Sequence, residues 1–434
     1  MTPPAPERPA PEPSPSASGR PATAASPPPA ADVPYRLDGA SGCPHAANAR
    51  LRAGGAVARV VLPGGVDGAL VLGHEALKDF LSHPDVAKDA SHFAALHTGE
   101  IPEHWPLRAF ATVRGMTTAD GADHRRLRSL ASRAFTPRRV ADLRPRIEEL
   151  TAQLLDGMER AAADGDGVVD LRRHLALPLP LSVICELLGV PEEGRARLHD
   201  LSNTIVSTDA APEDTLAANR EMLERLAEVV ALRRERPGDD LTSALIAARE
   251  EDGDRLDEDE LIGTLMLTVI AGHETTLNLI GNAVVALCGH PEQLALVRSG
   301  EADWGAVVEE VLRWDGPVSY FPFRYPARDL DVAGTVIPEG TPVLAGYSAA
   351  GRDPEAYGPD ADRFDVTRAA RHLSFGHGAH FCIGAPLARL ETTIVLDRLF
   401  TRFPGLRLAV PEEELPRRSS FVGNGVCALP VRLG

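Results

Sequence analysis

The chain has 434 residues and a formal net charge of −17, from 45 lysines and arginines against 62 aspartates and glutamates. A surface this acidic repels phosphate groups, which argues against a nucleic-acid-binding protein and against a protein of the anionic membrane surface. The apolar fraction of 44% is ordinary for a globular protein, and the length allows a large core with an internal cavity.

The first 33 residues are dominated by proline, alanine and serine. Such a segment buries too little apolar surface to offset the entropy lost on ordering, so we expect a disordered tail over residues 1–33 and one domain over residues 34–434. No basic segment followed by an apolar run begins the chain, and the longest apolar stretch, Leu261 to Gly272, is too short to cross ~30 Å of hydrocarbon. We expect neither a secretory signal nor a membrane anchor.

Five cysteines are widely spaced and odd in number, and none belongs to a Cys-x-x-Cys pair; they are Cys43, Cys185, Cys288, Cys382 and Cys427. This usage favours reduced thiols over a disulfide framework. We therefore expect a cytoplasmic protein, and we expect it to act as a monomer.

Two short β-type segments, 57–62 and 69–72, flank a Pro-Gly-Gly turn, and a short helix is predicted over 74–81. From about residue 120 the pattern is mostly helical, with apolar residues at i, i+3 and i+4 in the ranges 143–160, 175–188 and 215–234. Residues 261–288 predict a helix of about 40 Å at 1.5 Å per residue. Because this helix is apolar all round, we expect it to run through the middle of the molecule.

The strongest local signal is a glycine-punctuated loop that leads directly into a helix. Its fixed positions are Phe375, Gly376, Gly378, His380, Cys382 and Gly384. Glycine lets the backbone approach a flat ligand closely, and a cysteine just before a helix N-terminus lies where the helix dipole favours thiolate. This stretch resembles the haem-binding loop of the cytochrome P450 family, and the resemblance extends over residues 35–434.

The resemblance implies a mainly α fold, a triangular prism of helices with a small β-rich lobe, and haem b between the long central helix and the Cys loop. It implies that Cys382 is the axial ligand of the iron and that Phe375, Gly376, Gly384 and Ala271 contact the haem. A thiolate ligand favours cleavage of the O–O bond, which is consistent with dioxygen as co-substrate.

Glu274 and Thr275 interrupt the apolar central helix, where burial of polar groups is unfavourable unless they serve a purpose. A threonine hydroxyl can bond the carbonyl four residues earlier and open a local groove. The resemblance implies that Thr275 hydrogen-bonds the iron-bound oxygen and that Glu274 relays protons.

Glu310 and Arg313 share one face of an amphipathic helix. In the resembled family this pair is a buried structural ion pair completed by a downstream arginine. Either Arg352 or Arg368 could be the third member, and the sequence does not decide between them.

The haem propionates need cations, and arginine suits planar carboxylates. By resemblance the propionate-binding residues are His124 and Arg128, at i and i+4 on one helix, with Arg324 and His380.

The chain carries no flavin or iron–sulfur domain, so we expect NAD(P)H electrons to arrive through a ferredoxin and a ferredoxin reductase. A basic patch on an otherwise acidic protein could dock an acidic ferredoxin. The candidates for this patch are Arg125, Arg126, Arg133 and Arg389.

The substrate pocket is expected to be apolar and aromatic, which suits a mid-sized hydrophobic small molecule. By resemblance its candidate lining residues are Trp105, Ile270, Val318, Tyr320, Phe321, Phe323, Phe421 and Val422.

The expected reaction is dioxygen-dependent hydroxylation or epoxidation, in secondary metabolism. Two alternatives remain at this point. One is oxidative coupling or desaturation of a peptide or cyclic dipeptide, without insertion of oxygen. The other is a haem sensor without turnover, against which Thr275 argues.

Overall fold

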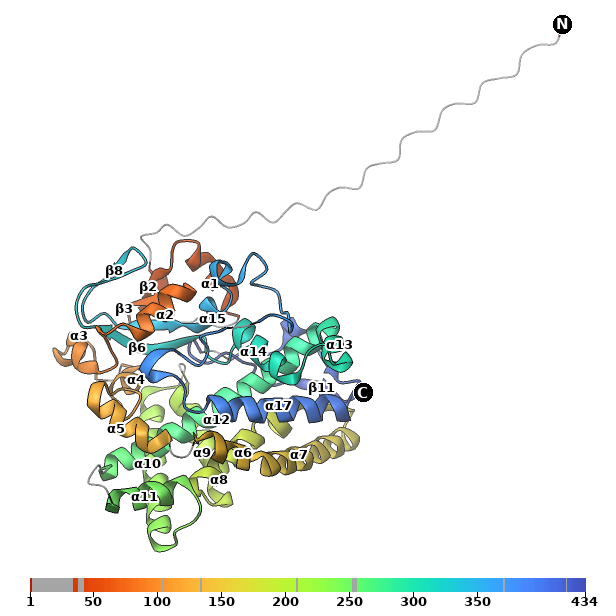
Figure 1. Cartoon of the computed structure of the whole chain (residues 1–434), viewed down its shortest axis with the longest axis horizontal. Helices are drawn as coiled ribbons and strands as arrows, with labels where there is room; N and C mark the ends of the chain where they lie inside the picture. Colours follow the sequence, from red (N-terminus) through yellow and green to blue (C-terminus); the bar gives the residue numbers. More distant parts are fainter. Residues whose placement is uncertain are drawn as a thin grey trace.

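The computed structural model describes residues 1, 34–37, 43–103, 105–132, 135–207, 210–251, 256–369, 371–418 and 420–434. The predicted disordered tail therefore lies outside the described residues, apart from Met1. Figure 1 shows a mainly helical molecule with β2, β3, β6 and β8 gathered at one end and β11 apart from them, beside the C-terminus.

The helices are α1 (His45–Arg52), α2 (His74–Ser82), η1 (Ala90–His92), α3 (Ala94–His97), α4 (Arg108–Thr112), α5 (Gly121–Ser132), α6 (Pro137–Asp142), α7 (Arg144–Asp164), η3 (Arg172–Ala176), α8 (Pro178–Leu188), α9 (Glu192–Val206), α10 (Pro212–Glu235), α11 (Leu241–Glu251), α12 (Glu258–Gly289), α13 (Pro291–Ser299), α14 (Trp304–Asp315), α15 (Tyr347–Ala350), α16 (Pro354–Tyr357), η4 (Gly378–His380), α17 (Ala385–Arg402) and η5 (Glu412–Glu414).

The strands are β1 (Tyr35–Arg36), β2 (Val57–Leu62), β3 (Val66–Val71), β4 (Val86–Ala87), β5 (Val168–Asp170), β6 (Tyr320–Pro326), β7 (Leu330–Val332), β8 (Thr335–Ile337), β9 (Val343–Gly346), β10 (Arg407–Leu408) and β11 (Pro430–Arg432). A six-stranded sheet has the order β1-β2-β3-β9-β6-β4, with β2 antiparallel to β3 and β3 parallel to β9. Strands β10, β11 and β5 form a smaller sheet, and β7 and β8 form a hairpin.

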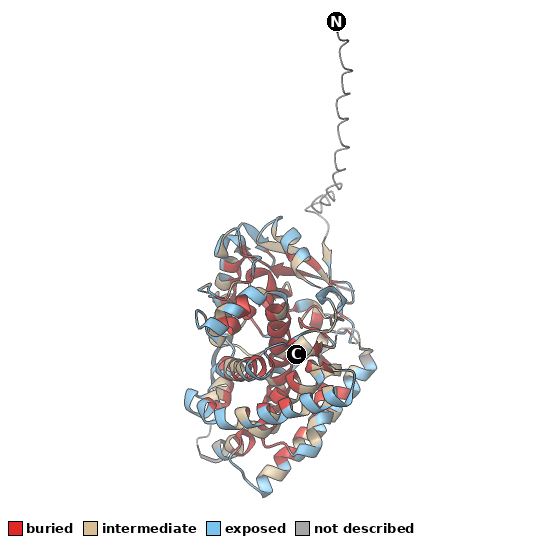
Figure 2. Cartoon of the chain, turned by 90° about the vertical axis from the view of Figure 1, so that its right-hand side faces the viewer, coloured by how far each residue is buried: buried red, intermediate tan, exposed pale blue. Residues whose placement is uncertain are grey.

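Helix α12 is the central element of the fold. It begins with a capping box, in which Asp257 accepts the backbone N–H of Glu260 and the Glu260 side chain accepts that of Asp257. Most of its side chains are buried, and it packs against α8, α10, α14 and α17. Figure 2 shows this buried interior. The prediction of a long helix through the middle of the molecule is confirmed.

The predicted helix 175–188 is confirmed as one helical stretch, with a change of bonding that the sequence did not indicate. A π-helical turn, η3, ends at Ala176, Leu177 keeps right-handed helical backbone angles (φ −82°, ψ −56°), and α8 starts at Pro178. Proline has no backbone N–H to donate within a helix but is accepted in the first turn, so the α-helical bonding starts there.

No single helix among the described residues has both the length and the apolarity to span a membrane. One pair of helices, Arg172–Leu188 and Glu192–Ile205, meets those two criteria only jointly and is bent by 115°.

A buried ion pair on α14 holds the segment that leads to the Cys loop. Arg313 and Glu310 are both fully buried, and the guanidinium donates from Nε and Nη2 to the two carboxylate oxygens, each at 2.7 Å. Its remaining N–H groups donate to the carbonyls of Gly351, Ala361 and Arg363 at 2.7–2.8 Å. All five donors are therefore satisfied, and one side chain joins α14 to residues 351–363.

Arg368, one of the two candidates for a third member, approaches the pair: its Nε lies 3.8 Å from Glu310 Oε1. Arg352 instead stacks on Trp314, with its guanidinium carbon 4.2 Å from the ring centroid, and donates to the Trp314 carbonyl.

Replacing Glu310 with Gln should lower the free energy of unfolding by about 3–5 kcal/mol, because Arg313 would stay buried without its anion. Guanidinium titration of the haem-loaded protein measures this change. The matched control is Glu258→Gln, which breaks an exposed pair with Arg234 and should change the same quantity by about 0–1 kcal/mol. Equal losses in the two variants would contradict a special role for the buried pair.

Candidate active site

A cavity lies between α12 and the Cys loop. Leu267, Ala271 and Thr275 line it from α12, and Phe375 to Gly376 and His380 to Gly384 line it from the loop. Two segments whose named residues are at least 100 positions apart in the sequence (375 − 275 = 100) thus line one space, as the sequence predicts for the site of a flat cofactor.

The glycines shape the Cys loop. Gly376 and Gly378 have φ of +75° and +72°. These angles lie in the left-handed region of backbone conformation, which residues other than glycine rarely adopt. Their turns bring the Cys382 backbone N–H to the carbonyl of Phe375 at 2.8 Å. The sulfur of Cys382 is thereby fixed at the cavity wall, just before α17.

Burial raises the pKa of the Cys382 thiol, although the backbone N–H groups of Gly384 and Ala385 and the charges of Arg128 and Arg389 oppose this shift. The sequence predicts that the helix N-terminus favours the thiolate. The backbone N–H groups there do lower the pKa of Cys382, but burial raises it by more. Coordination to a metal ion displaces the thiol proton, so a bound iron would supply the missing stabilisation of the thiolate.

Four cationic or titratable groups predicted to bind propionates gather at one end of the cavity. Arg128, Arg324 and His380 line the cavity, and His124 lies behind them, with its ring centroid 4.0 Å from that of His380. Arg128 donates to the carbonyl of Phe381 at 2.6 Å. Burial, with the nearby charges of His380 and Arg128, lowers the pKa of His124 to about 4, so this imidazole is neutral at neutral pH.

Two of these residues each have a buried polar nitrogen that makes no hydrogen bond to a described residue. Arg324 Nη1 and His124 Nε2 have no hydrogen-bond partner within the part of the chain that the structure describes. Unpaired buried polar atoms are rare in native proteins and indicate a missing partner. Together with the Cys382 sulfur and the apolar walls, they fit haem: Cys382 would hold the iron, and Arg324, Arg128 and His380 would hold the propionates.

On α12, the Thr275 hydroxyl donates to the carbonyl of Ala271 at 2.9 Å, the bond to the fourth preceding residue that the sequence predicts. Thr275 faces the cavity of the Cys loop and also a second cavity, which the neighbouring Glu274 lines as well. The Thr275 hydroxyl and the Glu274 carboxylate therefore lie on neighbouring residues of α12, where the walls of the two cavities meet.

Glu274 is ion-paired with Arg418, a residue that the sequence analysis did not identify. Burial alone would raise the pKa of Glu274, but the charge of the paired Arg418 opposes this shift and helps to lower the pKa below its ordinary value. Glu274 is thus an anion at neutral pH. The partner lies 144 positions away in the sequence, so no local pattern could have indicated it.

Lys88 is a second residue that the sequence analysis missed. It is buried, lines both cavities, and donates from Nζ to the carbonyls of Pro322 and Phe323 at 3.3 and 2.7 Å. Burial, reinforced by Arg324, lowers its pKa well below the ordinary value. The sequence offered one indication that Lys88 has a special role. Lysine is rare in this chain, and Lys78 is the only other one.

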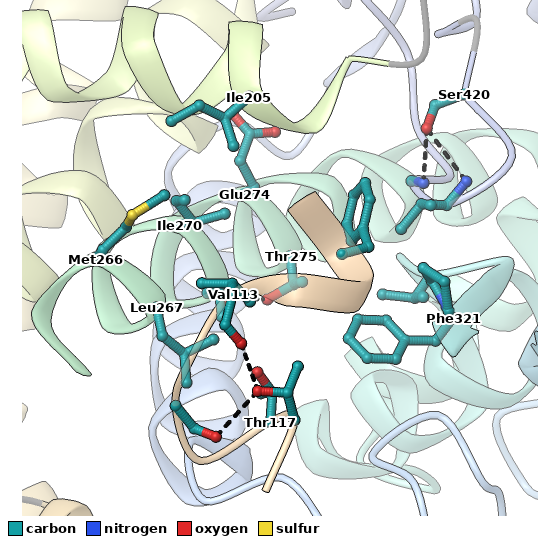
Figure 3. Close-up of a pocket in the computed structure, with 18 of the residues that line it drawn as sticks. Val113, Thr117, Ile205, Met266, Leu267, Ile270, Glu274, Thr275, Phe321 and Ser420 are labelled. Carbon is teal, nitrogen blue, oxygen red and sulfur yellow. Dashed lines mark hydrogen bonds between the residues drawn. The ribbon is translucent and has the colours of Figure 1, made fainter. Parts of the chain in front are cut away.

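The second cavity, shown in Figure 3, has mostly apolar walls. Of the predicted substrate-contacting residues, Ile270, Val318, Phe321 and Val422 line it. Its other apolar lining residues include Phe110, Val113, Ile205, Met266 and Leu267.

The prediction that Trp105, Tyr320, Phe323 and Phe421 line this cavity was wrong, because all four are buried in the core beside the large sheet. Along β6 successive side chains point to opposite faces, so Phe321 faces the cavity and Tyr320 the core. An irregularity in register between Phe321 and Arg324 then turns Phe323 into the core, where it stacks on Trp105.

The predicted basic patch is largely neutralised. Arg126 is paired with Glu260, and Arg389 is paired with Glu309 and lies over the Phe375 ring. Arg125 is exposed, and Arg133 lies outside the described residues.

Comparisons with known proteins agree with this geometry. The family model described as Cytochrome P450 matches residues 305–422. The chain is 42% identical over 402 residues to 2-hydroxy-5-methyl-1-naphthoate 7-hydroxylase of Streptomyces carzinostaticus, covering 92% of this chain and 97% of that protein. It is also 42% identical to cytochrome P450 monooxygenase PikC of Streptomyces venezuelae, over 90% of this chain and 91% of that protein. The solved structure of CYP154C4 from Streptomyces sp. W2061 superposes with a TM-score of 0.89 at 43% identity, covering 93% and 98% of the two chains.

Replacing Arg324 with Leu should speed haem loss roughly tenfold or more, since a charge-assisted hydrogen bond contributes about 1.5–3 kcal/mol. Transfer of haem to an excess of a haem-scavenging globin, followed by absorbance, measures the rate. The control is Arg328→Leu, four residues along, where an exposed arginine pairs with Asp85. Indistinguishable rates in the two variants would remove Arg324 from the haem site.

Proposed function

The chain belongs to the cytochrome P450 family and is a haem-iron monooxygenase, and on that premise we propose that it hydroxylates or epoxidises a mid-sized hydrophobic small molecule of secondary metabolism. The observation that supports this is that the two cavities adjoin each other and share part of their walls. Residues common to both walls include Leu267, Ala271, Thr275, Val318 and Phe321. A substrate in the apolar cavity would therefore lie directly beside the space that Cys382 faces.

The apolar side chains would bind such a substrate by excluding water, since burial contributes about 25 cal/mol per Å² of apolar surface. A few polar groups at the same walls, among them Thr117, Asn219 and Asn278, would orient it. Cys382 would hold the haem iron through its sulfur, and the bound haem would supply the oxidising chemistry, using dioxygen and two electrons.

The chain's own contribution to the chemistry is positioning and proton supply. Thr275 holds its hydroxyl at the cavity through the bond to Ala271, and Glu274 holds a carboxylate at the junction of the two cavities. We assign proton delivery to this pair, which is general acid work. Exclusion of bulk water by the apolar wall would keep that delivery confined to the pair.

The cofactor is haem b, and the electrons come from NAD(P)H through a ferredoxin and its reductase in this proposal. Arg125 remains an exposed candidate for docking the electron donor. Because Arg126 and Arg389 are neutralised by carboxylates, the steering charge on this face is smaller than the sequence predicts.

Turnover in ¹⁸O-labelled dioxygen tests the proposed reaction. Compounds that shift the haem spin state in a screen of macrolides, steroids, terpenoids and aromatic acids would be incubated with a surrogate ferredoxin and reductase. A product that gains one heavy oxygen is expected. Loss of two hydrogens without oxygen would establish coupling or desaturation instead, and absence of electron consumption with every spin-shifting compound would favour a sensor. Cys382→Ser serves as the inactive control and should lose the thiolate-type Soret band of the reduced carbon monoxide complex.

Thr275→Ala should keep the haem but divert electrons to hydrogen peroxide, because the hydroxyl that orients proton delivery is gone. We expect the ratio of product to NADPH consumed to fall roughly tenfold, with peroxide accounting for the difference. Thr264→Ala is the matched control, since Thr264 makes the same type of bond, to the Glu260 carbonyl at 2.7 Å, elsewhere on α12. Retained coupling in Thr275→Ala would exclude this threonine from the proton path.

A further inference from the structure

Glu274 lies beside a cluster of three polar side chains. His199 and Asn203 of α9 and His273 of α12 make up this cluster. Glu274 Oε1 lies 3.4 Å from His273 Nε2 and 3.6 Å from His199 Nδ1, and the two imidazole nitrogens are 3.1 Å apart. On the far side of His199, the Asn203 amide nitrogen lies 2.7 Å from Nε2. Both histidines and Glu274 are buried, so this is an enclosed polar cluster in an otherwise apolar region.

The hydrogen bonds fix where the protons are. Arg418 donates to the Asn203 amide oxygen at 2.8 Å, so the Asn203 amide group must donate to His199 Nε2. His273 Nδ1 donates to the Val269 carbonyl at 2.7 Å, which leaves its Nε2 as an acceptor. The proton between the rings therefore sits on His199 Nδ1 and is donated to His273 Nε2. Glu274 Oε1 lies 3.6 Å from the same nitrogen and is buried with no hydrogen-bond partner among the described residues, so it is free to accept that proton.

The cluster connects the substrate cavity with the protein surface. Glu274 lines the substrate cavity. Asn203 lines a different, open groove between α9 and α10, together with Arg197, Thr204, Asp214 and Glu221. His199 bridges the two residues, so a continuous series of contacts leads from the groove through one imidazole ring to the buried carboxylate.

We propose that His199 is a proton-relay residue that accepts a proton at Nε2 from the side of the α9–α10 groove and passes its Nδ1 proton to Glu274. This inference rests on the proposed role of Glu274 in proton delivery. One proton enters and one leaves at each step, so the ring gains no lasting charge. The Asn203 amide must rotate away from His199 Nε2 before a proton can reach that nitrogen. In the resting protein, the hydrogen bond from Arg418 holds the amide in place over Nε2.

The charged groups around the His199 ring allow it to carry a proton only transiently. Burial, with the nearby His273, lowers the pKa of His199 to about 4, and Glu274 and Asp200 oppose this while Arg172 adds to it. At neutral pH the relay is therefore a neutral ring beside an anion, and Arg172 and Arg418 face that anion from other segments. A proton on His199 is drawn to Glu274, and the resting state keeps no uncompensated positive charge on the ring.

His199, His273 and Glu274 are close enough to hold a metal ion, with ligand atoms all within 4.8 Å of one another. The proton positions argue against this, because His199 Nδ1 carries a proton where a metal ligand needs a free lone pair. The charge of Arg418 on Glu274 would further disfavour a divalent cation.

Nitrogen NMR of histidine-labelled, haem-loaded protein in its diamagnetic carbon monoxide complex tests the proton positions without any substrate. His199→Gln assigns the signals. We expect Nδ1 of His199 to be protonated and Nε2 not, and Asn203→Asp to move the proton to Nε2, because a carboxylate can only accept there. A wild-type ring protonated at Nε2 instead would overturn the proposal. So would stoichiometric Zn²⁺ binding that is lost in both His199→Gln and His273→Gln.

Proton flow is tested by mixing the reduced protein with dioxygen in a stopped-flow spectrometer and following its return to the oxidised spectrum. We expect the wild-type rate to keep rising as the pH falls from about 8 to about 5, without a plateau near the ordinary imidazole pKa of about 6.5 and with a solvent deuterium isotope effect. The reason is that the pKa of His199 is about 4, so its small protonated fraction grows over the whole of that range. His199→Gln should lower the rate at the acid end roughly tenfold or more and flatten the pH profile.

The matched control is Thr204→Ala, a groove residue on the same helix whose hydroxyl bonds to Asp200 instead of the cluster. It should keep the wild-type pH profile, and all variants should keep the haem spectrum and the helical circular dichroism. An unchanged pH profile and isotope effect in His199→Gln would overturn the relay. If labelled dioxygen reveals coupling chemistry while these measurements hold, the relay stands and only the proposed reaction fails.

Discussion

The structure depends on keeping a cavity open between α12 and the Cys loop while the rest of the interior packs densely. An apolar interior tends to close such a space, because every void loses dispersion contacts. The loop therefore needs to be held from outside the space, and Arg313 does this with its five donors. Glu310 and the carbonyls of Gly351, Ala361 and Arg363 fix residues 351–363 to α14. Ser374, eight residues before Cys382, is bonded to the Leu312 carbonyl on the same helix.

This role explains why an ion pair, and not a cluster of leucines, occupies the position. A buried pair gains little over apolar residues of equal volume, because desolvation offsets the attraction between the charges. Directional donors, however, define where each carbonyl must lie, and Gly351 shows how tight the fit is: a side chain there would meet the Arg313 carbonyl oxygen at 2.0 Å. The pair thus contributes geometric definition of the loop more than net stability.

Local patterns predicted the parts of the site that local chemistry determines. The glycine spacing around Cys382 and the apolar run of α12 each depend on neighbours in the sequence, and both were found. Arg418, Lys88 and His199 act through partners far along the chain, so no spacing rule could place them. Two misassigned pocket residues of β6 failed for a different reason. Tyr320 faces the core through the ordinary alternation of side chains along the strand, and Phe323 faces it because the register changes between Phe321 and Arg324. Pro178 was visible in the sequence, but the apolar period continued across it and concealed the change from π-helical bonding in η3 to α-helical bonding in α8.

The geometry of one turn of α12 explains how the surface and the cavity can communicate through so apolar a helix. Successive residues of a helix point about 100° apart, so three consecutive side chains divide the circumference among three directions. His273 faces α9, where it meets His199, and Thr275 faces the cavity of Cys382. Glu274 lies between them and reaches both the substrate cavity and Arg418. Placing the three polar groups in one turn brings Arg418, His199 and the Ala271 carbonyl to one level of the helix, so that the partners of all three side chains lie close together.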